Sequence, residues 1–117
     1  MRSDRLYLQD ILDAIAEVRR YLPEDRTTFK ENPLLQSHIL RHVQIIGEAA
    51  FRISRSLKDS SLQIPWRQIA GMRHILVHDY FRVDWNIVYN TSAKDLPALQ
   101  PSIEAILATI PPDSLAN

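Results

Sequence analysis

The stretch NPLLQSHILRHVQIIGEAAFRISRSL, residues 32–57, carries the strongest structural signal in the sequence. Its apolar residues recur every three or four positions, as they do on one face of an α-helix: Ile39, Val43, Ile46, Ala50, Ile53 and Leu57. Asn32 followed by Pro33 is a typical helix start, because asparagine caps free amide groups and proline suits the first turn. The stretch therefore predicts one long amphipathic helix from Pro33 to Leu57.

A glycine lies in the middle of this predicted helix. Inside a helix, glycine is about 1 kcal/mol less favourable than alanine. The usual compensation is a second helix that approaches too closely for any side chain to fit. We therefore expect Gly47 to be a packing residue at a helix–helix contact.

The rest of the chain predicts further helices. Apolar residues at helical spacing predict a first helix over Asp4–Tyr21, which Pro23 ends, followed by a polar connection over residues 24–31. A loop is expected over residues 58–63, and a third helix over Pro65–His78.

The last third of the chain predicts two more helical segments. Asp84 is expected to cap a fourth helix. Pro97 and Pro101 lack an amide hydrogen, so this helix should kink or restart near them before a final amphipathic helix over Leu99–Ile110.

These elements predict an all-α fold, a four- to five-helix antiparallel bundle in a single domain over residues 1–117. Residues 111–117 are expected to form a loose tail. The chain has only two glycines and no alternating strand pattern, which argues against a Rossmann fold or a phosphate-binding glycine loop. A chain of 117 residues buries a thin core, so a homodimer would be a natural supplement.

Composition narrows the setting further. The chain has no cysteine, which excludes disulfides and thiolate metal sites, and no apolar run long enough to span a membrane. We expect a cytoplasmic protein. Its 14 basic and 14 acidic residues give zero net charge, so contact with nucleic acid would need locally concentrated positive charge. Such a surface could consist of Arg41, Arg52, Arg55 and Arg67, although a solvated helix face is at least as good an interpretation.

The stretch PWRQIAGMRHILVHDY, residues 65–80, concentrates the residues that carry chemistry. Histidine has a near-neutral pKa and can move protons, and arginine can stabilise the charge of a phosphorane. Arg73 and His78 are five positions apart, so about 140° separates them around a helix. Two arrangements stay open: His78 lies where the helix ends and can swing, or the site is completed across a dimer axis.

Arg73 to His78 resembles the signature of the HEPN superfamily: arginine, a polar residue, three variable residues and histidine. His78 and Tyr80 extend it to the histidine-x-tyrosine form of the HepT-like branch. Residues 46–49, IGEA, resemble that branch's glycine–glutamate–alanine motif, and residues 65–73 resemble the run that leads into its active site. The resemblance covers nearly the whole chain. One departure is His74, at a position where this branch frequently has asparagine.

The resemblance implies a HEPN-like homodimer that acts as a metal-independent endoribonuclease, the toxin of a bacterial toxin–antitoxin pair. His78 would be general base or acid, and Arg73 would hold the scissile phosphate of an RNA, transfer RNA being one substrate by family. The 2′-hydroxyl would attack to leave a cyclic phosphate. A cognate MntA-like minimal nucleotidyltransferase antitoxin would attach AMP to Tyr80. His74, Asp79 and Glu48 are candidate supporting residues, and no metal or cofactor is implied.

Each of these residues also has a plain structural interpretation. Arg73 could be an exposed arginine, His78 a residue that the helix dipole favours, and Tyr80 a ring that packs over the end of the bundle. Glu48 could simply pair with Arg52 one turn later.

The histidines and tryptophans have alternatives too. His74 and His78 have zinc-ligand spacing but no third ligand evident in the sequence, and His38 and His42 repeat that spacing and are expected to be packed or at an interface. For Trp66 and Trp85, burial in the core is a better prediction than stacking on RNA bases.

Two other functions compete with the ribonuclease. One is a non-catalytic helical partner that presents a nucleotide or substrate to a nucleotidyltransferase. The other is a dimerisation protein without chemistry, which leaves residues 73–80 unexplained. The Arg73 and His78 pair favours the ribonuclease, because an adaptor has no need of a titrating histidine there.

Overall fold

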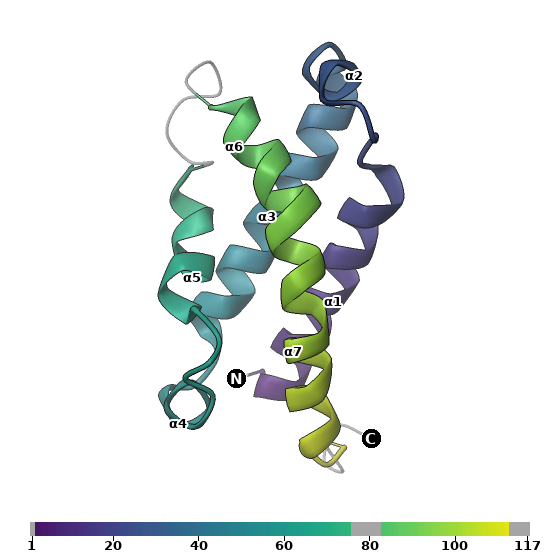
Figure 1. Cartoon of the computed structure of the whole chain (residues 1–117). Coiled ribbons are helices and arrows are strands. Elements are labelled where there is room, and N and C mark those ends of the chain that lie inside the picture. The colour runs from purple at the N-terminus through teal and green to yellow at the C-terminus, as the bar shows by residue number, and fades with distance from the viewer. Residues whose placement is uncertain (1, 76–82, 113–117) are drawn as a thin grey trace.

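The computed structural model describes residues 2–75 and 83–112, and this part of the chain is an all-helical bundle, as predicted (Figure 1). The main helices are α1 (Asp4–Tyr21), α3 (Pro33–Arg52), α5 (Trp66–Ile75), α6 (Trp85–Asn90) and α7 (Leu96–Thr109). Two short helices, α2 (Arg26–Lys30) and α4 (Arg55–Ser60), and a π-helix, η2 (Thr91–Asp95), complete the described elements. Over these residues, none of the helices has both the length and the apolar character needed to cross a membrane.

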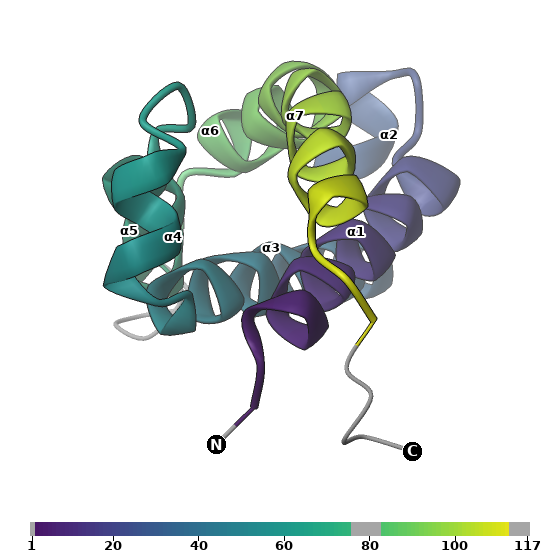
Figure 2. The same ribbon diagram turned by 90° about the horizontal axis from the view of Figure 1, so that it is seen from below.

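The long elements run up and down as in an antiparallel bundle. α1 and α5 run in one direction, and α3 and the continuous α6–η2–α7 rod run in the other (Figure 1). α3 is central, since α1 packs on one side of it and α5 on the other (Figure 2). α7 packs against α1, whereas α5 packs mainly against α3.

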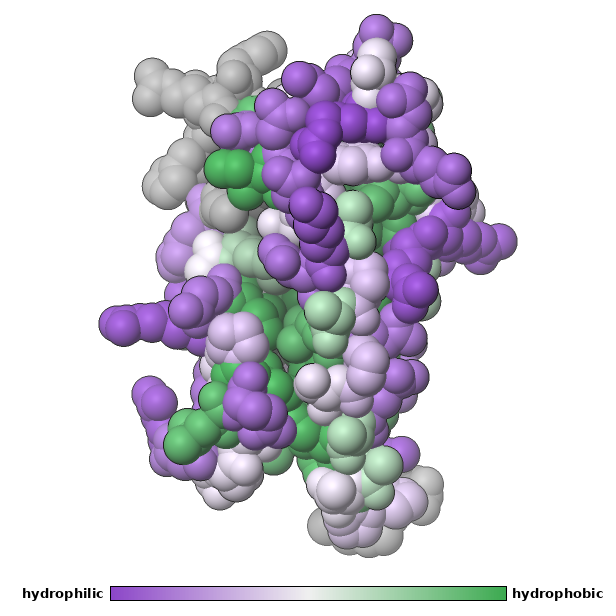
Figure 3. All heavy atoms as spheres, in the orientation of Figure 1, coloured by the Kyte–Doolittle hydropathy of each residue, from purple (hydrophilic) through white to green (hydrophobic). Residues whose placement is uncertain are grey.

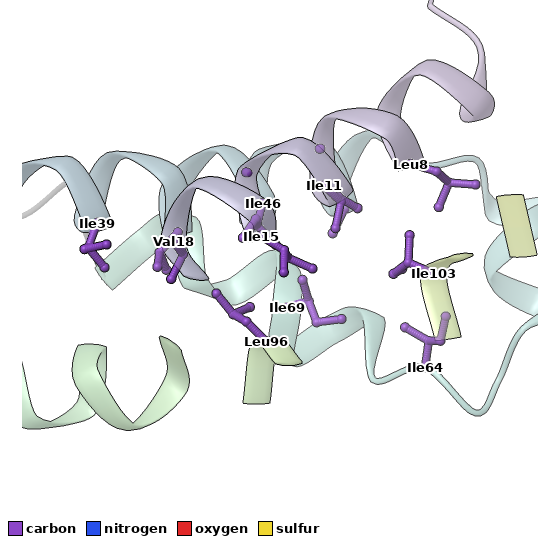
Figure 4. Close-up of a cluster of buried hydrophobic side chains, with 14 of the residues drawn as sticks. Leu8, Ile11, Ile15, Val18, Ile39, Ile46, Ile64, Ile69, Leu96 and Ile103 are labelled. Carbon is purple, nitrogen blue, oxygen red and sulfur yellow. The ribbon is translucent and has the colours of Figure 1, made fainter. Parts of the chain in front are cut away.

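The core forms where the apolar stripes of the helices meet (Figure 4). The predicted stripe of α3 is buried, including Ile39, Val43 and Ile46, and it faces fully buried side chains of α1 such as Ile11 and Ile15. Burying one such side chain stabilises the fold by about 1.5–3 kcal/mol. Leu96 and Ile103 of α7 close the core, and the burial of Ile103 confirms the apolar periodicity predicted for the last helix.

The predicted helix starts at Asn32 and Asp84 are confirmed. The Asn32 side chain accepts a hydrogen bond from the Leu35 amide at 3.1 Å, and Asp84 accepts from the amides of Asn86 and Ile87. Each cap satisfies amide groups that the first turn of a helix leaves free.

The prediction that α3 continues to Leu57 is wrong. α3 ends at Arg52, and Ser54 is extended and caps the separate helix α4. The physical reason is a long-range contact: the Asp4 carboxylate accepts hydrogen bonds from the Ser54 amide and hydroxyl at 2.8 and 2.5 Å. Leu57 therefore lies on α4, and the loop predicted over residues 58–63 begins with the last turn of that helix.

The predicted polar connection over residues 24–31 is also more ordered than expected, because it contains α2. Phe29 is fully buried there and packs its ring against Trp85 and Tyr89, with centroids 6.0 and 5.6 Å away. One aromatic anchor in a polar segment gives no periodic signal, so sequence analysis missed it.

The expectation of a kink or restart at the prolines is correct for Pro97 and wrong for Pro101. The backbone stays helical through η2, whose π-helical hydrogen bonds give way to those of α7 at Leu96, next to Pro97, which has no amide hydrogen to donate. Pro101 lies inside α7 without breaking it. The burial of Ile103 and Ile106 beyond Pro101 outweighs the one hydrogen bond that proline cannot donate.

Gly47 marks a helix–helix contact, as predicted. A Cβ atom at Gly47 would lie 2.6 Å from the backbone nitrogen of Arg73 and 3.1 Å from the carbonyl oxygen of Ile69. Both atoms belong to the backbone of α5, which cannot rotate away as a side chain can. The absence of a side chain at Gly47 therefore sets how closely α5 packs on α3.

We expect Gly47→Ala to lower the free energy of unfolding by about 1–3 kcal/mol, the range for overpacking. Gly71→Ala is the matched control, because a Cβ there meets nothing within 4 Å. That change should raise the free energy of unfolding by about 0.5–1 kcal/mol through helix propensity and unfolded-state entropy. Urea unfolding of the two variants measures the difference. Equal stabilities would show that the α3–α5 contact is looser than described.

Candidate active site

The Gly47 contact holds the backbone of Arg73, and two side chains of α3 hold its guanidinium group. The Arg73 Cζ atom lies 3.4 Å from the centroid of the Phe51 ring, a close cation–π contact. Its Nη1 atom lies 3.9 Å from Glu48 Oε2, which is close enough for an ion pair but too far for a hydrogen bond. The side chain is 23% exposed, so it is mostly enclosed yet reaches solvent.

Glu48 interacts with both Arg52, its partner in the plain structural interpretation, and Arg73, the predicted site residue. One carboxylate oxygen accepts a hydrogen bond from Arg52 Nε at 3.1 Å, one turn along α3, and the other faces Arg73. Among the described residues, the buried Nε atom of Arg73 has no hydrogen-bond partner. The Arg73 guanidinium is therefore positioned mainly by stacking, and its hydrogen-bond donors are not used up by the described part of the protein.

A hollow of about 630 Å³ opens beside Arg73, between α5 and the segment from the end of α3 to α4. Its lining residues are Phe51, Arg55, Lys58, Trp66, Arg67, Ala70, Gly71, Arg73 and His74. We call this hollow the basic pocket, because four of these residues are cations and none is a carboxylate. A cavity of this charge suits a polyanion.

The pKa of Lys58 is lowered in the basic pocket. Burial is the largest cause of its lowered pKa, and the neighbouring Arg55 and Arg73 lower it further, against an opposing effect of Asp4. The Lys58 ammonium donates a hydrogen bond to the Phe51 carbonyl at 3.2 Å, which keeps it at the pocket. A bound anion would relieve this repulsion and favour the charged lysine.

The basic pocket explains how a chain of zero net charge presents local positive charge. The sequence suggested that Arg41, Arg52, Arg55 and Arg67 could form such a surface. Arg55 and Arg67 do line the pocket. Arg52 instead pairs with Glu48, and Arg41 is not among the lining residues. Sequence analysis missed Lys58 because it fell in a predicted loop. The three-residue spacing from Arg55 to Lys58 was the signal that could have found it.

The other predicted site residues divide into those described and those not. His74 is exposed in the last turn of α5 and lines the basic pocket beside Arg73. His78, Asp79 and Tyr80 lie outside the described residues, of which Ile75 is the last before the gap.

The two tryptophans belong to the core rather than to a base-stacking surface. Trp66 is 7% exposed, and its indole nitrogen donates to the Ser61 carbonyl at 3.1 Å. Trp85 is half-buried and packs its ring against Phe29. The predicted preference for burial is therefore confirmed for Trp66, and Trp85 agrees with it in part. Phe51, at 48% exposure, is the accessible aromatic residue of the pocket lining.

The family model of HepT-like ribonucleases matches residues 11–106, from the first helix to the last. The chain belongs to the HepT-like ribonuclease family. The match includes Gly47, Glu48 and Arg73, so the contact that seats Arg73 lies within the HepT-like part of the chain. Membership of this family supports a ribonuclease with an RNA substrate.

Individual relatives agree with the HepT-like family match. A protein of Thermococcus cleftensis named "Probable ribonuclease HepT" is 34% identical over 90% of this chain and 96% of its own length. A protein of Caldanaerobacter subterraneus subsp. tengcongensis, assigned provisionally as an RNase, is 34% identical over 92% of this chain and 96% of its own. A further relative, from Methanocaldococcus jannaschii and also assigned provisionally as an RNase, is 27% identical over 90% of this chain and 97% of its own length. No solved structure matches the chain significantly.

The basic pocket generates a prediction about salt dependence. We expect Lys58→Met to weaken binding of a 2′-O-methylated RNA, which cannot be cleaved, and to reduce the slope of log K against log salt by about 0.7 for one lost phosphate contact. Lys30→Met is the matched control, because exposed Lys30 lies on α2, at the other end of the bundle from α4 (Figure 1). Fluorescence anisotropy at several salt concentrations measures both. The same loss in both variants would mean that net charge, not the pocket, attracts RNA.

Proposed function

We propose that this chain is a metal-independent endoribonuclease that uses Arg73 and His78 at the cleft of a homodimer. The observation that carries the proposal is the seating of Arg73. It is mostly enclosed at the edge of a basic pocket, stacked on Phe51, five residues before a histidine in a HepT-like chain. A cation positioned in this way can stabilise charge as it develops on a phosphate.

The reaction needs only proton transfers and one displacement at phosphorus. A general base removes the proton from the ribose 2′-hydroxyl, and the 2′-oxygen forms a bond to phosphorus. The bond from phosphorus to the 5′-oxygen of the next nucleotide breaks, and that oxygen takes up a proton. The products are a 2′,3′-cyclic phosphate and a 5′-hydroxyl. His78 would act as general base or acid, and Arg73 would neutralise the charge on the phosphorane.

A homodimer would supply the second proton-transferring group. If the helix continued to His78, about 140° would separate it from Arg73, and a single copy would not present both on one narrow face. Two copies across a symmetry axis would bring two Arg73 and His78 pairs into one cleft. The basic pocket of each copy would then hold phosphates on either side of the scissile one, in a substrate that could be transfer RNA or messenger RNA.

We propose further that the chain is the toxin of a toxin–antitoxin pair, and that an MntA-like minimal nucleotidyltransferase neutralises it by attaching AMP to Tyr80. Tyr80 lies two residues from His78. A bulky anion there would occupy the cleft and compete with RNA for Arg73 and for the cations of the basic pocket. His74, Asp79 and Glu48 would support the site, His74 from the pocket edge and Glu48 by its charge beside Arg73.

RNA cleavage in EDTA tests the catalytic proposal. Wild type should produce cyclic-phosphate ends, and His78→Ala should lower the cleavage rate by about 10²- to 10⁴-fold, the usual contribution of general acid–base catalysis. Arg73→Lys should also be slow, because lysine keeps the charge but loses the planar stack on Phe51. Equal cleavage by wild type and His78→Ala would assign the activity to a contaminant or to another site.

If clean, unmodified wild type leaves total cellular RNA intact, the proposal fails. The non-catalytic partner, which presents a nucleotide or substrate to a nucleotidyltransferase, would then be the better account. Size-exclusion chromatography of the same sample would show whether it was dimeric during the test.

The antitoxin proposal has its own test. Incubation with an MntA-like minimal nucleotidyltransferase and with ATP should add AMP to the wild type, seen by intact mass, and should abolish cleavage. Tyr80→Phe should gain no mass and keep its activity. AMP on another residue, or inhibition of Tyr80→Phe to the same extent, would remove Tyr80 from the mechanism.

A further inference from the structure

A second cluster of chemically active side chains lies on α1 and α3, remote in sequence from the basic pocket. Glu17 of α1 and His38 of α3 face each other, with Glu17 Oε2 and His38 Nε2 3.1 Å apart. His42 lies one turn along α3, and its ring centroid is 4.4 Å from that of His38. One potential ligand atom from each residue lies within 4.8 Å of the other two.

The hydrogen bonding of His42 resembles that of a metal ligand. Its Nδ1 atom lies 2.8 Å from the His38 carbonyl oxygen, to which it donates a hydrogen bond. In a neutral imidazole this bond requires the proton on Nδ1, which would leave the lone pair on Nε2. Metal-ligating histidines usually donate their second ring nitrogen to a carbonyl or carboxylate in the same way, which fixes the tautomer and the orientation of the ring.

The distances fit a tetrahedral ion. Zinc binds nitrogen at about 2.0–2.1 Å and carboxylate oxygen at about 2.0–2.2 Å, so two ligands of one tetrahedral ion are about 3.3 Å apart. The Glu17–His38 separation of 3.1 Å already matches this value. The ligand atoms of all three half-buried residues lie within 4.8 Å of one another, so the separations to His42 can be wider than that of a tetrahedral ion.

The surroundings allow an ion to enter and be retained. The side chains of His38 and Glu17 are 37% and 36% exposed, which opens the cluster to solvent. The ring of Tyr21 packs edge-on against His38, with centroids 5.0 Å apart, and limits the movement of that imidazole. Two imidazoles and one carboxylate form a donor set that zinc uses in proteins, with a water molecule as fourth ligand.

We propose that Glu17, His38 and His42 bind a zinc ion that links α1 to α3. The link would stabilise the helix that carries Gly47, Glu48 and Phe51, and it is separate from the chemistry proposed at Arg73. The sequence shows the histidine pair, but the third ligand comes from another helix, which is why the sequence analysis expected no metal.

Titration of tag-free protein with zinc tests the proposal. Wild type should bind one zinc per chain, and Co²⁺ in its place should give the intense visible absorption of a tetrahedral site. His42→Ala and Glu17→Gln should each weaken zinc binding by at least about tenfold, since even the loss of an outer-shell partner has an effect of that size. Both side chains are half-buried, and circular dichroism checks that both variants fold.

His74→Ala is the matched control, because His74 has the same four-residue spacing to His78 that His38 has to His42. It should bind zinc as wild type does. Zinc binding that is lost in His74→Ala and kept in His42→Ala would move the site to α5 and overturn the proposal, as would binding unaffected by all three changes.

Thermal unfolding gives a second readout that does not depend on RNA cleavage. A ligand that binds only the folded state raises the unfolding temperature in proportion to the logarithm of its concentration. Zinc should raise the unfolding temperature of wild type and of His74→Ala, and leave that of His42→Ala unchanged. The same zinc-induced shift in His42→Ala would contradict a site at this cluster.

Discussion

The backbone contact between Gly47 and Arg73 is the constraint on which the rest of the structure depends. α5 packs mainly on α3, and at Gly47 the two helices approach so closely that a Cβ atom would lie 2.6 Å from the Arg73 nitrogen. This approach seats Arg73 beside Phe51 and Glu48 and places α5 along one wall of the basic pocket. The helix penalty of one glycine, about 1 kcal/mol, is small beside the packing it permits.

Positive charge is concentrated in the pocket beside Arg73. Acidic and basic residues balance over the chain, yet the described residues that line the pocket beside Arg73 include four cations and no carboxylate. The surface view in Figure 3 shows hydrophilic side chains over much of the visible face, with apolar atoms between α5 and α7, where Ile69, Met72 and Leu96 border a small hollow. Burial is the largest cause of the lowered pKa of Lys58, and the positive charges of Arg55 and Arg73 lower it further.

α3 carries residues of both the candidate active site and the proposed zinc site. Its C-terminal half carries Gly47, Glu48 and Phe51, which hold Arg73, and its N-terminal half carries His38 and His42, which face Glu17 of α1. α3 packs against α1 on one side and against α5 on the other, and such packing restricts the movement of a helix. Groups attached to it keep their positions, which is what a site needs if a cation is to meet a developing charge.

The sequence by itself determined the features that act within one or two turns of a helix. These include the apolar stripes of α1, α3 and α7, the caps at Asn32 and Asp84, and the need for a close neighbour at Gly47. The pattern from Arg73 to His78 likewise pointed to the HepT-like family, because its spacing is local.

Only the tertiary structure decided the rest. The hydrogen bonds from Ser54 to Asp4 end α3 early and create α4, which brings Lys58 to the basic pocket, and Phe29 anchors α2 under the rings of α6. Glu17 meets the histidines of α3 in the same way, across two helices. Each of these contacts joins residues more than twenty positions apart. The packing of the helices determines which residues meet in these contacts, and the local periodicity of a helix does not encode that packing.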